Sequence, residues 1–252
     1  MKTITITAQK GGVGKTSTCI HLAQALSLRG YRVLVIDLDA QCNATYSLNG
    51  ENIEGRNALA MLVVTAAQPF IQNVAPNIDL VAGTIETKDA SMILNNTGGQ
   101  FKLQKALKPL KDNYDFCLID TKPEVSQVTI NALTASDYVI IPVECEIYSL
   151  QGLSQIKQLI DSVKDSYNPS IEVLGVLINK FDTRTTFTKE VLDTLEGAIS
   201  SMNMELFETK VRNNIKIKEA QAIKKNLFEY APKSNGAVDF QNVVNEVLER
   251  IK

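Results

Sequence analysis

The sequence predicts an α/β fold in which a mostly parallel β-sheet is flanked by helices on both faces. Apolar runs of strand length alternate with helix-length amphipathic segments from end to end. Several of these runs are continuously apolar, as in strands buried on both faces. The 252 residues are 44% hydrophobic and contain no internal repeat and no Pro/Gly/Ser-rich linker. We therefore expect a single domain over residues 1–252.

The expected strands are β-branched or apolar runs, and they cover residues 3–8, 31–37, 77–83, 114–120, 137–143, 171–179 and 206–211. The expected helices lie at 17–30, 126–135, 149–166, 187–201 and 237–252, with Gly30 closing the first. The segment 49–100 has no clear period. After it, lysines recur every third residue, which predicts a solvated helix face interrupted by proline, at Lys102, Lys105, Lys108, Lys111 and Pro109.

Composition excludes several classes of protein. The formal net charge of -2 gives no global attraction to nucleic acid or to anionic lipid, so either would need a local basic patch. The cysteines form no CxxC pair, which favours a reduced cytoplasmic setting over a disulfide framework or a metal cluster; they are Cys19, Cys42, Cys117 and Cys145. His21 is the only histidine and cannot build a metal cluster. We expect no signal peptide and no membrane span.

A glycine-rich run, KGGVGKTS at 10–17, follows the first expected strand and opens the first helix. Glycines let successive backbone N–H groups converge on phosphate oxygens, and the helix N-terminus favours the same anion. The predicted nucleotide-binding residues are Gly11, Gly12, Val13, Gly14, Lys15, Thr16 and Ser17. In this prediction Lys15 contacts the β- and γ-phosphates, and the Thr16 hydroxyl binds Mg²⁺.

The loop carries a second lysine, Lys10, where phosphate loops usually have their first glycine. A cation on the rim of the loop is placed to project toward a nucleotide bound by a facing subunit. There it would stabilise charge that develops during γ-phosphoryl transfer. The alternative is that Lys10 pairs with a nearby carboxylate of its own chain.

Three aspartates lie at the ends of expected strands. Asp37 and Asp39 close the second strand, and alternation lets only one of them face the γ-phosphate readily. Asp120 ends the run YDFCLID and fits a residue that holds Mg²⁺ through water. The candidate metal-binding residues are therefore Thr16, Asp37 and Asp120. Ordinary strand-end aspartates remain the alternative for all three carboxylates.

These motifs resemble the deviant Walker A ATPases, and more narrowly the ParA/Soj-type DNA-partitioning ATPases. The likeness covers nearly the whole chain and rests on KGGVGKT, VLVIDLDAQCNAT, YDFCLIDTKP, TINALTASDYVIIPVECEIYSLQGLSQI, NPSIEVLGVLINKFDTRT, VRNNIKIKEA and FEYAPKSNGAVDF. The resemblance implies a P-loop NTPase fold, ATP and Mg²⁺ as cofactors, and a homodimer that forms on ATP binding. It assigns Asp39 to positioning the attacking water, Asp37 to supporting the site, and catalytic roles to Lys10 and Lys15. Departures from the pattern at Ala40, Cys42, Thr121 and Lys122 leave the hydrolysis rate and the dimer geometry open.

The base specificity depends on the same resemblance. NKFD at 179–182 also matches the NKxD pattern with which small GTPases recognise guanine. In the family that the chain resembles, Asn179 would touch adenine and the loop FEYAPK would wrap the base through Pro232. The prediction is ATP.

A basic stretch at 210–225 contrasts with the nearly neutral chain. Such a surface neutralises DNA phosphates without recognising bases, although a solvated helix face is the alternative. The resemblance implies non-specific DNA binding there by the ATP-bound dimer, and the predicted residues are Arg184, Arg212, Lys216 and Lys218.

The functional expectation is a cytoplasmic, nucleoid-associated partitioning ATPase that a ParB-like centromere-binding protein stimulates. No membrane partner is expected. The first alternative is a MinD-type, membrane-cycling ATPase of the division site, which would need an amphipathic extension beyond the final LERIK helix. A reductase of the nitrogenase iron-protein type would need paired cysteines. A third alternative is a protein that uses the same ATP-dependent dimerisation in assembly or regulation and not in segregation.

Overall fold

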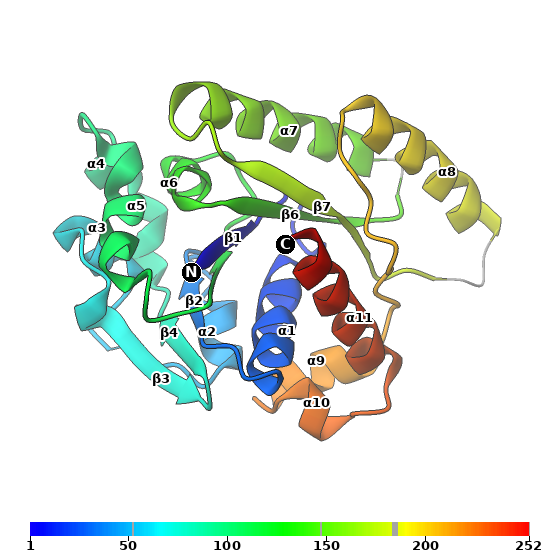
Figure 1. Cartoon of the computed structure of the whole chain (residues 1–252), viewed down its shortest axis with the longest axis horizontal. Helices are drawn as coiled ribbons and strands as arrows, with labels where there is room; N and C mark the ends of the chain where they lie inside the picture. The colour runs from blue at the N-terminus through cyan, green and yellow to red at the C-terminus, as the bar shows by residue number, and fades with distance from the viewer. Residues whose placement is uncertain (52, 147, 183–185, 252) are drawn as a thin grey trace.

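The computed structural model describes residues 1–51, 53–146, 148–182 and 186–251. Its centre is a seven-stranded sheet with the order β3-β4-β2-β5-β1-β6-β7 (Figure 1). All neighbouring strands pair in parallel except β3 and β4, which are antiparallel. The strands are β1 (Lys2–Ile6), β2 (Val33–Asp37), β3 (Ile71–Ala75), β4 (Ile78–Val81), β5 (Phe116–Asp120), β6 (Tyr138–Glu144) and β7 (Glu172–Asn179). The predicted sheet is confirmed.

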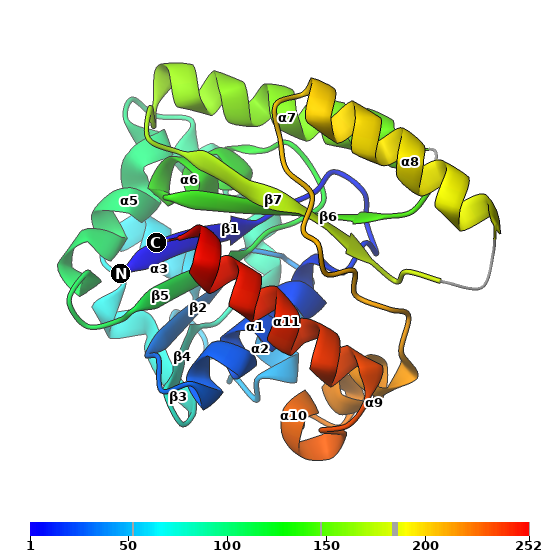
Figure 2. The same ribbon diagram turned by 45° about the vertical axis from the view of Figure 1, so that its right-hand side comes forward.

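Helices cover both faces of the sheet (Figures 1 and 2). They are α1 (Lys15–Leu28), α2 (Asn43–Ser47), α3 (Ala58–Val64), α4 (Ser91–Leu94), α5 (Lys102–Leu107), α6 (Gln127–Ala135), α7 (Ser149–Ser166), α8 (Thr186–Ser201), α9 (Ile215–Ala222), α10 (Leu227–Tyr230) and α11 (Asn235–Arg250). Strand alternation divides the core between the two faces: Val33 and Val35 pack with residues of α1 and α11, whereas Leu34 and Ile36 pack with α3, α5 and α6. On that second face, α7 and α8 cover β6 and β7.

The structure corrects the prediction at two places. Within the expected strand at 206–211 only Leu206 forms a bridge, with Val176, and just beyond the range Arg212 bridges Phe181. The segment runs beside β7 without a continuous ladder. The unassigned segment 49–100 contains the antiparallel edge strand β3, which is partly exposed and so lacks the continuous apolar signal of a buried strand. The predicted lysine-rich face is solvated, with Lys105, Lys108 and Lys111 exposed. Only its first half is α-helical, because α5 ends at Leu107 and Pro109 lies in the short 3₁₀ turn that follows.

The sheet brings the expected site residues to one edge. The β2–β5 register places Asp37 opposite Asp120, and the β1–β5 register places Ile6, the last residue of β1, opposite Asp120. On the other side of β1, the β6–β7 register pairs Glu144 with Asn179. The carboxyl ends of five parallel strands therefore meet beside the glycine-rich loop, the usual ligand-binding edge of such sheets. Within the described residues, no helix has the length and apolar character needed to cross a membrane.

Candidate functional site

The glycine-rich loop has the backbone that phosphate binding requires. Gly12 and Gly14 have φ of 80° and 90°, in the left-handed region that favours glycine. Gly14 also caps α1, and a Cβ there would lie 2.7 Å from Asn179 Nδ2. Because α1 starts at Lys15, the N–H groups of its first turn are directed toward the loop. Both the conformation and the space around Gly14 therefore restrict the position to glycine.

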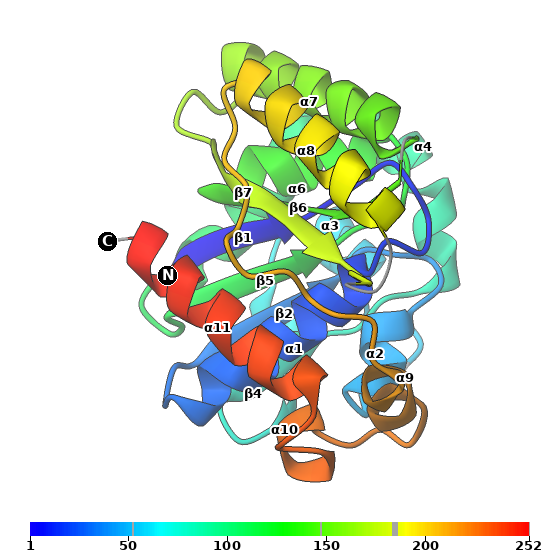
Figure 3. The ribbon, with the colours of Figure 1, turned by 90° about the vertical axis from the view of Figure 1, so that its right-hand side faces the viewer.

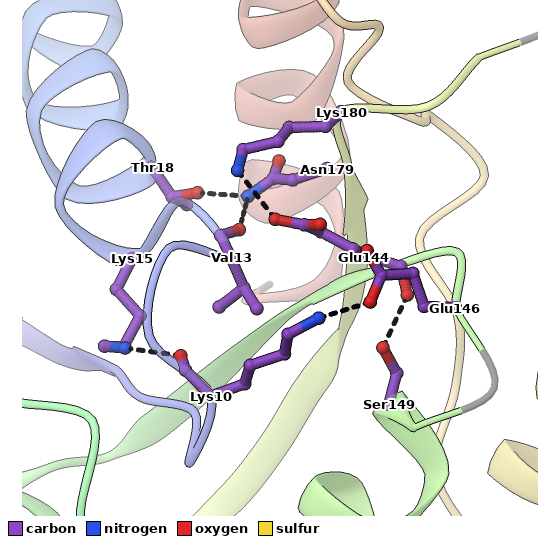
Figure 4. A network of polar contacts seen from close by, with 9 residues as sticks. All are labelled: Lys10, Val13, Lys15, Thr18, Glu144, Glu146, Ser149, Asn179 and Lys180. Carbon is purple, nitrogen blue, oxygen red and sulfur yellow. Dashed lines mark hydrogen bonds and ion pairs between the residues drawn. The ribbon is translucent and has the colours of Figure 1, made fainter.

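Lys15 is folded over the loop. Its side chain is buried, and Nζ donates a hydrogen bond to the main-chain oxygen of Lys10 at 3.0 Å (Figure 4). Burial lowers the pKa of Lys15, and the nearby carboxylates of Asp120 and Asp39 act in the opposite direction. The ammonium group thus lies at the loop itself, close to two of the three predicted aspartates.

Lys10 extends away from Lys15 and pairs with Glu146, in the turn between β6 and α7 (Figure 4). The hydrogen bond from Lys10 holds the pKa of Glu146 below its usual range, and the same bond raises the pKa of Lys10. A second pair, Lys180 with Glu144 at 2.7 Å, lies next to the first. In the single chain, Lys10 therefore has the carboxylate partner that is the alternative to a role in a facing subunit. The side chains of Lys10 and Glu146 are 40% and 45% exposed.

Asp37 and Asp120 lie on neighbouring strands but differ in their hydrogen bonds. Asp37 is fully bonded: Oδ2 accepts from the Thr45 N–H at 2.8 Å and the Thr45 hydroxyl at 2.7 Å, and Oδ1 accepts from the Asp39 N–H at 3.1 Å. Burial raises the pKa of Asp37 to about 6. Both oxygens of Asp120 are buried and have no hydrogen-bond partner among the described residues. Burial raises the pKa of Asp120 well above its usual range, and the charge of Asp37 adds to this shift.

The unbonded carboxylate of Asp120 fits a hard cation. The hydroxyl of Thr16 lies near Asp120 without forming a well-aligned hydrogen bond. Carboxylate and hydroxyl oxygens are the donors that Mg²⁺ prefers, together with phosphate and water. Asp37, with three hydrogen bonds already formed, instead anchors the loop that carries Asp39. Among the described residues, no group of three or more His, Cys, Asp or Glu side chains is arranged to hold a metal ion.

Asp39 lies just beyond β2 and is buried, with Oδ1 accepting from the Gln41 N–H at 2.9 Å. The next turn places Cys42 at φ 54° as the cap of α2. Burial raises the pKa of the Cys42 thiol to about 11, and the charges of Asp37 and Asp39 add to the shift. Of the other departures, Thr121 donates to the Ile6 main-chain oxygen at 3.0 Å, and Lys122 pairs with Glu124.

A hollow lies beside the loop, next to Asn179. Its lining residues are Gly14, Ser17, Asn179, Lys180, Val211, Arg212, Asn213, Asn214, Ile217, Lys218 and Phe240. Asn179 Nδ2 donates to the Val13 main-chain oxygen at 2.9 Å and to Thr18 Oγ1 at 3.1 Å (Figure 4). Its Oδ1 atom is buried and has no partner among the described residues. The hollow is therefore continuous with the phosphate loop, and Asn179, one of the residues that line it, has a buried hydrogen-bond acceptor that is unused among the described residues.

The predicted DNA-binding residues do not share one environment. Lys216 pairs with Glu219 at 2.8 Å and lies over the Tyr230 ring, whereas Lys218 is exposed at the rim of the hollow. Arg212 forms an ion pair with Asp239 at 2.6 Å. Arg184 lies outside the described residues. Pro232 is exposed between α10 and α11 and is absent from the lining of the hollow.

Sequence reasoning missed two acidic partners, Glu146 and Asp239. Each lies far along the chain from the cation that it binds. Both fall in stretches that carry the family resemblance, but the resemblance gave neither residue a role. The only available signal was that each cation needs a countercharge when partly buried. A sequence by itself does not say which carboxylate supplies it.

Comparison with known proteins adds a family to this geometry. The family model for an AAA domain matches residues 1–173. The sporulation initiation inhibitor protein Soj of Bacillus subtilis is 35% identical over 250 residues, which cover 98% of each chain. The chain belongs to the ParA/Soj family of P-loop ATPases.

Solved structures support the same fold. A plasmid partition protein of Borrelia burgdorferi bound to AMPPNP has a TM-score of 0.83 and 25% identity, with 98% of each chain covered. Cobyrinic acid a,c-diamide synthase of Mycobacterium smegmatis with bound ADP and magnesium has a TM-score of 0.85 and 25% identity, covering 99% of this chain and 94% of the synthase. Proteins whose names indicate different activities thus share this fold. The fold alone therefore does not specify the reaction.

Proposed function

We propose that this chain is a DNA-partitioning ATPase that binds ATP and Mg²⁺, dimerises, and then binds DNA without sequence specificity. The observation that carries the proposal is the pair of unbonded Asp120 oxygens next to Thr16, at the mouth of a loop that already contains Lys15. A buried carboxylate without a donor is costly unless a cation satisfies it. The Borrelia partition protein that binds AMPPNP supports a nucleoside triphosphate as the ligand.

Adenine fits the unused acceptor in the hollow. Because both donors of the Asn179 amide are occupied by Val13 and Thr18, the group has only Oδ1 to offer a base. The exocyclic amine of adenine donates to such an oxygen, whereas the O6 atom of guanine is an acceptor and would face it unfavourably. The proposal is therefore ATP, although NKFD matches the guanine-recognising pattern.

In this mechanism Lys15 binds the β- and γ-phosphates and neutralises their charge. Mg²⁺ would be held by Thr16 and, through water, by Asp120, and it would supply further neutralisation at the same phosphates. Asp39 orients the attacking water, since its carboxylate lies beside the phosphate loop and is held by the turn that Asp37 anchors. Lys10 approaches the phosphates of a facing subunit, which requires its pair with Glu146 to open.

The dimer then presents two copies of the basic segment to DNA. Lys216 and Lys218 project from α9, near Lys224 and Lys225, and supply charge without a recognition helix long enough for base contacts. Hydrolysis, stimulated by a ParB-like partner, would separate the subunits and release the DNA. In this cycle the chain acts at the nucleoid in the cytoplasm and positions a replicon before division.

The test is retention of the purified chain on duplex DNA of arbitrary sequence, with Mg²⁺ and either ATP or ADP. The proposal predicts retention with ATP, little with ADP, and a steep loss as salt is raised. Equal retention with both nucleotides, or no retention with ATP, would contradict ATP-dependent DNA binding. ATP-dependent sedimentation with anionic vesicles in place of DNA would instead support the membrane-cycling alternative.

A further inference from the structure

We propose that Arg212 and Asp239 are a positioning pair that fixes one wall of the base hollow, so that Arg212 serves nucleotide binding and not DNA binding. The inference rests on the proposed function in taking a nucleoside triphosphate as the ligand. It reassigns a residue that the sequence placed in the basic surface, and it adds Asp239, for which the sequence predicted no role.

The contact between the two residues is extensive. Asp239 Oδ2 accepts from the Arg212 main-chain N–H at 2.9 Å and from Nε at 3.0 Å, while Oδ1 accepts from Nη2 at 2.6 Å. The carboxylate thus binds the backbone and the guanidinium of the same residue. Asp239 is 6% exposed, and the hydrogen bond to it raises the pKa of Arg212. A two-point guanidinium–carboxylate pair fixes orientation as well as distance.

The pair holds an extended segment from its outer side. On the inner side, the Val211 N–H bonds to the Ile178 oxygen at 2.8 Å, and the Asn213 N–H bonds to the Phe181 oxygen at 3.1 Å. In extended backbone the intervening N–H of Arg212 points the opposite way, and there it meets Asp239. The segment is therefore bonded alternately to the end of β7 and to α11, whose ribbons flank it in Figure 3.

The same segment forms the wall of the hollow. Its four residues from Val211 to Asn214 line the hollow together with Asn179, and Phe240, next to Asp239 in α11, lines it too. Phe240 also packs on the buried ring of His21 in α1, with ring centroids 5.0 Å apart. The packing between α11 and α9 is also tight at Gly236, where a Cβ would lie 2.8 Å from Ile217 Cγ1. Asp239 thus connects the wall to a tightly packed part of the core.

A DNA contact by Arg212 would bring a phosphate next to the Asp239 carboxylate, which would repel it. A guanidinium that turned away to meet the phosphate would leave a buried carboxylate without its cation. Lys218 has no such restraint, because no ion pair of this residue is found among the described contacts and its side chain is exposed. The charge of Arg212 is therefore neutralised within the chain, whereas that of Lys218 is available at the surface.

The chain contains a matched control for the test. Arg32 binds Asp115 in the same way, with its main-chain N–H at 2.8 Å and Nη2 at 3.1 Å from the carboxylate. This pair lies at the opposite edge of the sheet, where β2 and β5 begin, far from the loop. Arg32→Gln therefore makes the same chemical change as Arg212→Gln and leaves the hollow intact.

The experiment is calorimetric titration of each variant with ATP and with inorganic tripolyphosphate, both with Mg²⁺, alongside DNA binding by fluorescence anisotropy. We expect Arg212→Gln to weaken ATP binding about tenfold and to change tripolyphosphate binding less than about twofold. Asp239→Asn should do the same, and Arg32→Gln should change neither. Arg212→Lys, which keeps the charge but loses the two-point contact, should recover only part of the ATP affinity.

Other outcomes overturn the inference. Equal losses for ATP and tripolyphosphate would assign the effect to the phosphate loop or to general destabilisation, which thermal unfolding of the free variants also measures. Unchanged ATP binding with weaker DNA binding in Arg212→Gln, or stronger DNA binding in Asp239→Asn, would restore Arg212 to the DNA surface. If the unsubstituted chain binds ATP no better than tripolyphosphate, the hollow does not hold the base, and this inference fails while the phosphate site stands. Failure of the unsubstituted chain to bind either ligand would instead refute the proposed function itself.

Discussion

The phosphate loop at 10–17 and the basic stretch at 210–225 are both short lysine-containing runs, yet they differ in what fixes their side chains. In the loop, Gly12 and Gly14 set the backbone, and Lys15 bonds to a main-chain oxygen five residues away. In the basic stretch, Arg212 binds Asp239, which lies 27 residues further along the chain. A role that local backbone geometry determines follows from the sequence, whereas a role determined by a distant countercharge requires the fold.

The largest expected effect lies in the loop. Lys15→Ala removes a buried cation from the place where the triphosphate charge accumulates, so ATP affinity should fall by roughly 100-fold or more. Calorimetric titration with ATP and Mg²⁺ measures this loss. An ATP affinity within threefold of that of the unsubstituted chain would show that Lys15 does not bind the phosphates. The role that local backbone geometry predicts for the loop would then be wrong.

Asp39→Ala tests the catalytic part of the same region. The variant keeps the loop, Thr16 and Asp120, so ATP binding should persist, while the steady-state release of phosphate falls about 100-fold because no carboxylate orients the water. A phosphate-release assay paired with an ATP titration separates the two. Normal turnover would exclude Asp39 from the mechanism. Asp37, whose three hydrogen bonds hold the turn that carries Asp39, would then have a structural role only.

Lys216→Glu tests the basic stretch, with a smaller expected effect. The substitution reverses one charge on α9, and DNA affinity of the ATP-bound form should fall about tenfold, equally for duplexes of unrelated sequence. Lys164→Glu, at an exposed position near the end of α7, is the matched control and should leave DNA binding unaffected. Equal losses in the two variants would indicate a net-charge effect and not a defined surface.

The smallest expected effect concerns Glu146, the partner of Lys10. The side chains of Lys10 and Glu146 are 40% and 45% exposed, and pairs of this kind stabilise by about 0.2–1 kcal/mol. Glu146→Gln should therefore favour ATP-dependent dimerisation at limiting protein by no more than about fivefold for each of the two Lys10 side chains, because neither has to leave its own carboxylate. Weaker dimerisation in this variant would show that Glu146 contributes to the dimer interface and does not compete with the facing subunit for Lys10.

The fold was predictable from the sequence to the extent that buried strands carry a continuous apolar signal. The six parallel strands carry it, but β3 at the edge is half-exposed and was missed. The site was predictable where a residue type is demanded locally, as at Gly14. It was not predictable where neighbouring strand ends differ only in hydrogen bonding: Asp37 and Asp120 look alike in sequence, but Thr45, eight residues beyond Asp37, satisfies only Asp37.

The account depends most on nucleotide-driven pairing of two chains through Lys10. Multi-angle light scattering with Mg²⁺ and a non-hydrolysable ATP analogue tests it directly. The account predicts twice the 27.7 kDa of one chain for the unsubstituted protein, and a single-chain mass for Lys10→Ala under the same conditions. A single-chain mass for the unsubstituted protein, or a dimer that persists in Lys10→Ala, would contradict it.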